Sequence, residues 1–113
     1  MAEQVFSDIE RLVYNWLTAH KIDFKFQTSL SGGFFSLGGM VVDFLIPDIW
    51  VAIRVMGEYW HRGVLPEGKA VLQREQLEAM GWTVVDLWGE DILDPDRLEQ
   101  AMNLALQGRE MLD

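Results

Sequence analysis

The sequence predicts an α/β or α+β three-layer sandwich, in which helices flank a mixed central sheet. The predicted elements follow the order helix, three strands, helix, strand, helix. Half of the 113 residues are apolar and 12% are aromatic, a composition that supports a packed core. Because 113 residues lie within the usual size of one domain, we expect residues 1–113 to form a single domain.

The first predicted helix covers residues 5–20, where apolar residues recur at helical spacing. These residues are Val5, Ile9, Leu12, Val13, Trp16 and Leu17. Ser7 and Glu10 have the spacing of a capping box, in which each residue satisfies a backbone amide of the first turn. Alternating apolar and polar residues then predict a strand over 23–28.

Two adjacent apolar runs, 40–46 and 50–56, predict a pair of strands joined by a short turn at Pro47. Each run contains a single charged residue, Asp43 in the first and Arg54 in the second. Burying a charge costs several kcal/mol unless the charge is paired. These two positions are therefore the first candidates for a functional site, and we expect them to lie close together.

The C-terminal half adds a helix over 69–80 that ends at Gly81, followed by a strand over 82–88 rich in β-forming residues. Asp94 and Pro95 then predict the start of a last helix, with a capping side chain and proline in the first turn. Its apolar stripe consists of Leu98, Ala101, Met102, Ala105 and Leu106.

Composition excludes several classes of protein. The chain has no cysteine, which rules out a disulfide framework, a thiolate metal site and a cysteine nucleophile. No apolar run approaches the roughly 18 residues that span a bilayer, and the N-terminal Met1-Ala2-Glu3-Gln4 includes an acidic and a polar residue. We therefore expect a cytoplasmic protein without membrane insertion.

The net charge is −9, which is unusual for a protein that binds nucleic acid. The charge is unevenly distributed, however. Residues 1–42 contain four acids and three bases, residues 43–74 four and four, and residues 75–113 ten and two. A neutral middle could still contact DNA if the acidic C-terminal third faces away from the polymer.

Four segments, taken in order, resemble one known family. They are VVDFLIP, VAIRV, MGEYWH and EAMGWTVVDLW, between Val41 and Trp88. Together they are similar to the very-short-patch-repair branch of the PD-(D/E)XK restriction-endonuclease-like nucleases. This resemblance implies a restriction-endonuclease-like core and an endonuclease that hydrolyses DNA phosphodiesters with Mg²⁺ or Mn²⁺.

The resemblance also assigns roles to residues of the predicted strand pair. Asp43 matches the metal-binding aspartate, and the backbone carbonyl of Val55 matches a second ligand. His61 matches one of two histidines and would act as general acid or base, whereas Met56 occupies the position of the other. Where many relatives have Glu-x-Lys, Arg54 stands at the glutamate position; it would contact a phosphate or pair with Asp43.

Two of the remaining candidates, Trp60 and Glu10, also have a structural interpretation. Tyr59 and Trp60 match a DNA-contacting wedge, and Arg62 follows them, although core packing is the alternative for Trp60. Glu10 could hold a metal-bound water, although its capping role is sufficient to explain it. Trp16 and Trp82 are expected in the core.

A second hypothesis concerns the class of protein. The missing Glu-x-Lys pair and the negative charge favour a catalytically silent nuclease fold that serves as an interaction module or homodimer. Asp43 and the MGEYWH segment favour a role on DNA instead.

Overall fold

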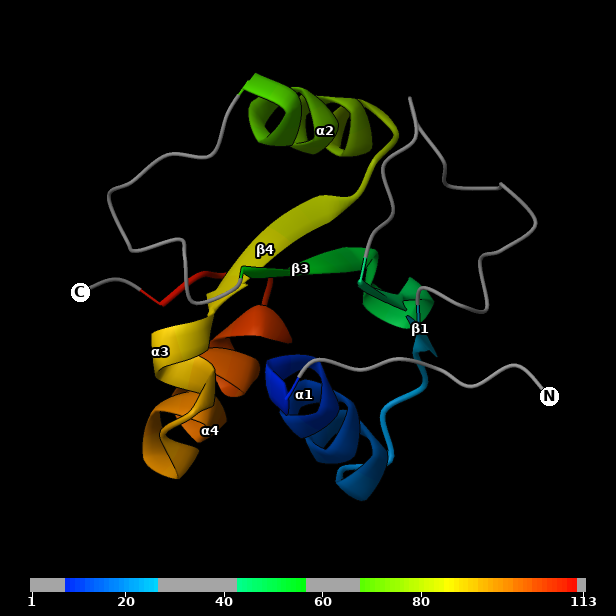
Figure 1. The fold of residues 1–113 in the computed structure, drawn as a ribbon. Helices are drawn as coiled ribbons and strands as arrows, with labels where there is room; N and C mark the ends of the chain where they lie inside the picture. Colours follow the sequence, from blue (N-terminus) through cyan, green and yellow to red (C-terminus); the bar gives the residue numbers. More distant parts are fainter. Residues whose placement is uncertain (1–7, 27–42, 57–67, 112–113) are drawn as a thin grey trace, which may run out of the picture.

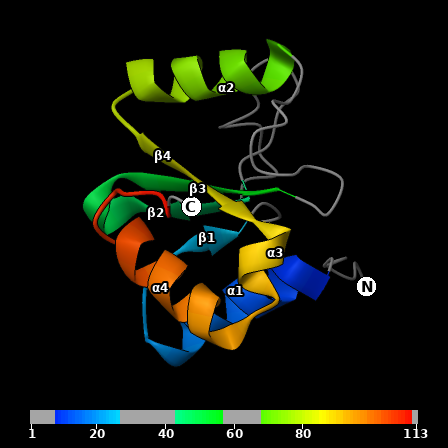
Figure 2. The same ribbon diagram turned by 90° about the vertical axis from the view of Figure 1, so that its left-hand side faces the viewer.

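The computed structural model describes residues 8–26, 43–56 and 68–111, which form an α+β sandwich. A mixed four-stranded sheet has the strand order β1-β2-β3-β4, with α2 on one face and α1, α3 and α4 on the other (Figures 1 and 2). The elements are α1 (Asp8–Ala19), β1 (Lys25–Phe26), β2 (Phe44–Ile46), η2 (Pro47–Ile49), β3 (Val51–Met56), α2 (Gly68–Ala79), β4 (Thr83–Trp88), α3 (Gly89–Ile92) and α4 (Pro95–Ala105). The predicted fold class and element order are confirmed.

The sheet combines antiparallel and parallel pairs. β1 and β2 are antiparallel, and so are β2 and β3, where Phe44 lies opposite Ile53. β3 and β4 are parallel, with Arg54 opposite Asp86. A parallel pair needs a crossover connection, and α2 lies in the segment that makes it. The carboxyl ends of β3 and β4 therefore meet at one edge of the sheet.

The main core lies between the sheet and the helices α1 and α4. Its α1 side chains are Ile9, Val13, Trp16 and Leu17, as the helical spacing predicted. Leu12, which the sequence placed in the same stripe, is instead 36% exposed because it lies at the margin of that stripe. The predicted core positions of Trp16 and Trp82 are confirmed by exposures of 9% and 7%.

The opposite face of the sheet has a much smaller apolar cluster beneath α2. It consists of Leu45, Ala52, Leu77, Trp82 and Val84. Further along the same strands, the next side chains on this face are Arg54 and Asp86, because side chains two positions apart share a face. The layer under α2 therefore changes from apolar to charged toward the carboxyl end of β3.

The ends of the helices follow the predicted chemistry. The side chain of Asp94 accepts hydrogen bonds from the amides of Asp96 (3.0 Å) and Arg97 (3.4 Å) at the start of α4. Gly81 has φ +100°, and the amide of Trp82 donates to the carbonyl of Leu77, which ends α2. The sequence did not predict the short helix α3. Ser7 and the end of the strand predicted over 23–28 lie outside the described residues.

No helix in the described ranges is both long enough and apolar enough to cross a membrane.

Candidate active site

Asp43 is the residue immediately before β2, and its side chain crosses to β3. Its Oδ2 accepts a 2.7 Å hydrogen bond from the backbone amide of Val55. In the register that pairs Phe44 with Ile53, Asp43 comes next to Arg54. The strand pair predicted from the two apolar runs thus brings Asp43, Arg54 and Val55 together.

Glu10 reaches the same point from the first turn of α1. A side-chain hydrogen bond joins its carboxyl group to that of Asp43. Burial, this hydrogen bond and the charge of Glu10 raise the pKa of Asp43 from 3.8 to about 8. The Val55 amide and the Arg54 charge act in the opposite direction but do not offset these causes. Near neutral pH, Asp43 is therefore largely protonated.

The oxygen atoms at this point suit a hard divalent cation. The N–H and C=O of a strand residue face the same neighbouring strand, so the Val55 carbonyl points toward the side on which Asp43 lies. Two carboxyl groups and one carbonyl are ligands that Mg²⁺ and Mn²⁺ accept, with water completing the coordination. Within residues 8–26, 43–56 and 68–111, no group of three or more His, Cys, Asp or Glu side chains forms a metal cluster. Among the described residues, the side-chain donors at this point are thus the two carboxyl groups of Glu10 and Asp43.

Arg54 is 6% exposed and pairs with Asp86, a partner that was not predicted from the sequence. Its Nε donates to Oδ1 of Asp86 at 2.7 Å, and its Nη2 donates to Oδ2 at 2.9 Å. This is a bidentate ion pair between directly opposed residues of β3 and β4. Asp86 is a lone charge in an otherwise apolar or β-forming strand, the signal that had singled out Asp43 and Arg54.

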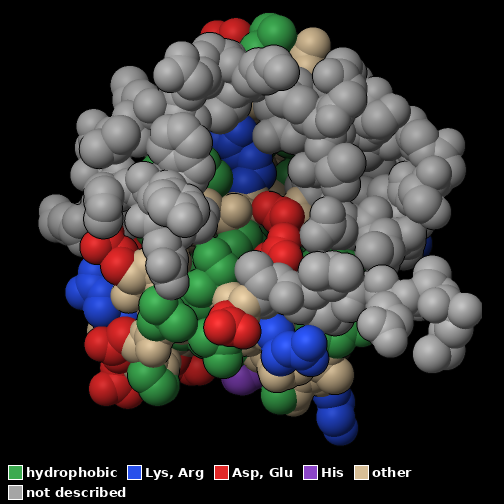
Figure 3. Space-filling view, viewed as in Figure 1, with side chains coloured by type: hydrophobic (Ala, Val, Ile, Leu, Met, Phe, Trp, Pro, Cys, Tyr) green, Lys and Arg blue, Asp and Glu red, His purple; other side chains and the backbone are tan. Residues whose placement is uncertain are grey.

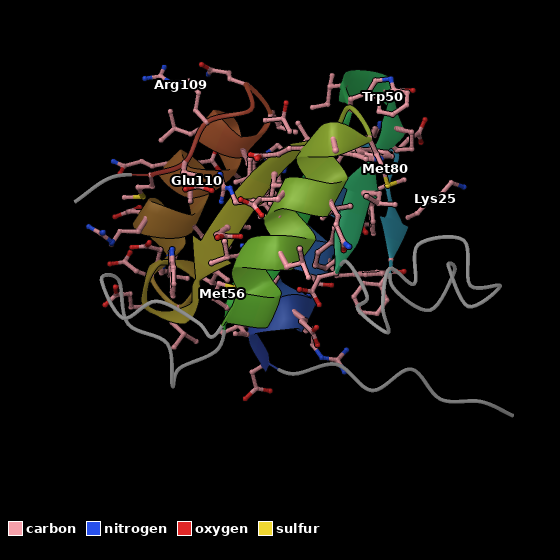
Figure 4. All side chains as sticks on the ribbon, turned by 90° about the horizontal axis from the view of Figure 1, so that it is seen from above. Lys25, Trp50, Met56, Met80, Arg109 and Glu110 are labelled. Carbon is pink, nitrogen blue, oxygen red and sulfur yellow. The ribbon has the colours of Figure 1, made fainter. Side chains whose placement is uncertain are left out.

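A second arginine continues the network away from the candidate site. Nη1 of Arg74, from α2, contacts Oδ2 of Asp86 at 3.3 Å and Oε2 of Glu110 at 2.9 Å. Glu110 also accepts a 3.0 Å hydrogen bond from the Asp86 amide. In Figure 4, Glu110 lies on the side of β4 away from β3, whereas Met56 marks the carboxyl end of β3. Acidic and basic side chains lie next to one another near the middle of the face in Figure 3.

The structure brings together Glu10, Asp43, Arg54 and Val55, four of the predicted site residues. Four predicted site residues lie outside the described residues, and their roles stay predictions. They are Tyr59, Trp60, His61 and Arg62. Sequence reasoning missed Asp86, Arg74 and Glu110.

Comparison with known proteins supports the fold. No family model matches the chain, and no curated protein matches its sequence significantly. A solved structure, the homing endonuclease I-Bth0305I catalytic domain, is similar with a TM-score of 0.64 and 21% identity. The match covers 87% of this chain and 92% of that chain. The chain therefore has a nuclease-like fold, in agreement with the predicted restriction-endonuclease-like core.

Proposed function

We propose that this protein is a divalent-metal-dependent DNA endonuclease of the PD-(D/E)XK type, close to the very-short-patch-repair branch. The observation that carries the proposal is the hydrogen bond between the carboxyl groups of Glu10 and Asp43. Two carboxyl groups placed this close, in a partly desolvated position, destabilise each other when both ionise. A divalent cation between them would remove that cost.

The proposed metal ligands are Glu10, Asp43 and the Val55 carbonyl, with Mg²⁺ or Mn²⁺ as the ion. When bound, such an ion supplies charge neutralisation at the phosphate and lowers the pKa of a bound water. His61 is the proposed general acid or base, because neutral imidazole and imidazolium are both accessible near neutral pH. Tyr59, Trp60 and Arg62 are the proposed DNA contacts.

We do not propose that Arg54 binds a phosphate as its main role. Its Nε and Nη2 are engaged by Asp86, so its charge is partly neutralised and its guanidinium plane is fixed. Arg54 would add positive potential beside Asp43 rather than grip the polymer strongly.

A plasmid-nicking assay tests this function. Supercoiled DNA incubated with the purified protein and Mn²⁺ or Mg²⁺ should be nicked, and EDTA should abolish nicking. Asp43→Ala should reduce the rate by at least about 100-fold while circular dichroism shows a folded protein. Exchanging the exposed Asp48 for alanine provides the control and should leave nicking unchanged. Nicking that persists undiminished in Asp43→Ala would sink the proposal.

The alternative remains a catalytically silent nuclease fold that acts as an interaction module or homodimer. The neutralised Arg54 and the net charge of −9 favour this alternative. A silent fold should bind neither Mg²⁺ nor Mn²⁺ at Asp43, and in the homodimer version sedimentation should show a dimer.

A further inference from the structure

The candidate metal site contains an electrostatic conflict. Arg54 precedes Val55 in β3 and lies next to Asp43 in the register of the strand pair. Its positive charge attracts the carboxyl group of Asp43, because the two residues are directly opposed in that register. A guanidinium beside a carboxylate is a direct competitor of a divalent cation, because both are attracted to the same oxygen atoms.

Asp86 binds the guanidinium that would otherwise compete with the cation. It binds the Arg54 guanidinium through both carboxylate oxygens, at 2.7 and 2.9 Å. The side chains of Arg54 and Asp86 are only 7% and 11% exposed, so water screens this pair weakly. The pair holds the guanidinium on the β4 side of β3. Asp43 precedes β2, which lies on the other side of β3.

Asp86 is in turn held by groups outside the site. Arg74 approaches its Oδ2 at 3.3 Å, and Glu110 accepts a hydrogen bond from its backbone amide at 3.0 Å. Arg74 is anchored by Glu110 at 2.9 Å and by the Val84 carbonyl at 3.2 Å. Asp86 is thus fixed from α2 and from the C-terminal segment.

We infer that Asp86 is a positioning residue that withholds Arg54 from Asp43 and so keeps the Asp43 carboxylate available to a divalent cation. This inference rests on the proposed metal site of Glu10, Asp43 and Val55. It explains how an arginine can occupy a strand position beside the metal ligands without closing the site. Removing Asp86 would release the guanidinium next to Asp43, its neighbour in the strand register.

A double-mutant cycle on metal binding tests the inference. Mn²⁺ affinity is measured by isothermal titration calorimetry for the wild type, Asp86→Asn, Arg54→Met and the double variant. Asp86→Asn should weaken Mn²⁺ binding by at least about tenfold, because the released cation competes for Asp43. In the Arg54→Met background the same change should alter affinity by less than about threefold, since no competitor remains.

A matched control separates this effect from loss of a buried ion pair in general. Asp91 is 2% exposed and is paired with Arg97 at 2.7 Å, among the helices on the other face of the sheet. Asp91→Asn should lower stability but leave Mn²⁺ affinity unchanged. If Asp86→Asn does not fold, Asp86→Thr replaces it in the cycle. The same results are expected, because threonine also removes the carboxylate that binds Arg54 and is favoured in strands.

The outcomes are distinguishable. Equal effects of Asp86→Asn in both backgrounds, or no effect in either, overturn the inference while the metal site stands. The same two results overturn the inference when the cycle is run with Asp86→Thr. A wild type that binds no Mn²⁺ overturns the proposed function itself, and the inference with it.

Discussion

The carboxyl group of Glu10, in the first turn of α1, is hydrogen-bonded to the carboxyl group of Asp43, the residue before β2. The two residues come from different layers of the sandwich, so only the folded chain brings them together. Placing two acids in contact is unfavourable for stability, and proteins retain such arrangements chiefly at functional sites. The consequences for stability and for metal binding are measurable.

The stability of the protein should depend on pH through Asp43. Its pKa is raised from 3.8 to about 8 in the folded state, so folding favours the protonated form. The stabilisation is complete below pH about 4 and is lost as pH rises through about 8. Asp43→Asn cannot ionise and should be more stable than the wild type by at least about 2 kcal/mol at pH 9, with little difference at pH 4.

Urea denaturation at the two pH values, in the presence of EDTA, provides this measurement. The exposed residue Asp23 supplies the control, because Asp23→Asn should shift stability equally at both pH values. An Asp43→Asn variant that is less stable than the wild type at pH 9 would show that the carboxyl pair is not strained.

Because Arg54 forms a buried ion pair, the stability of an Arg54 variant should depend on the charge of the new side chain. Arg54→Met leaves Asp86 in contact with Arg74, which approaches it at 3.3 Å. Arg54→Glu instead places a second carboxylate opposite Asp86 on β4, in a poorly hydrated position. Thermal and urea unfolding should show Arg54→Glu to be less stable than Arg54→Met by about 2–4 kcal/mol. Equal stability of the two variants would contradict the assigned pairing.

Gly81 should be required for its backbone conformation rather than for its small size. Its φ is +100°, whereas an added Cβ would meet the Trp50 ring at an ordinary distance of 3.8 Å. Gly81→Ala should therefore destabilise the protein by about 1–2 kcal/mol, and Gly81→Asn by less, because asparagine tolerates positive φ better. If thermal unfolding gives the same melting temperature for alanine and glycine, the assigned conformation is wrong.

The sequence predicted most of the fold because its signals are local. Helical spacing identified the buried side of α1, and Asp94 with Pro95 identified the start of α4. Apolar runs identified β2 and β3, and the lone charges within them predicted that Asp43 and Arg54 lie close together, which the strand register agrees with. These signals depend on residues that are near one another in the sequence, so they can be recognised without the tertiary structure.

The unpredicted part of the site depends on contacts between distant segments. Glu110 follows the last helix in an irregular segment, and nothing in its neighbourhood indicates that it meets Arg74 of α2. Glu10 had a sufficient local explanation in its capping spacing, which concealed its contact with Asp43. Asp86 carried the lone-charge signal, but its pairing with Arg54 became apparent only from the parallel register of β3 and β4.

The central claim is that Glu10, Asp43 and the Val55 carbonyl form one divalent-metal site, and Mn²⁺ titration calorimetry at pH 7.5 tests it most directly. The wild type should bind one Mn²⁺ and release about one proton, because Asp43 has a pKa of about 8 and must ionise to coordinate. Glu10→Gln and Asp43→Asn should each weaken binding by at least about tenfold, since each removes a charged ligand. Glu99→Gln, which changes an exposed acid on α4, should bind as the wild type does. A wild type that binds no Mn²⁺, or Glu10 and Asp43 variants that bind it equally well, would contradict the account.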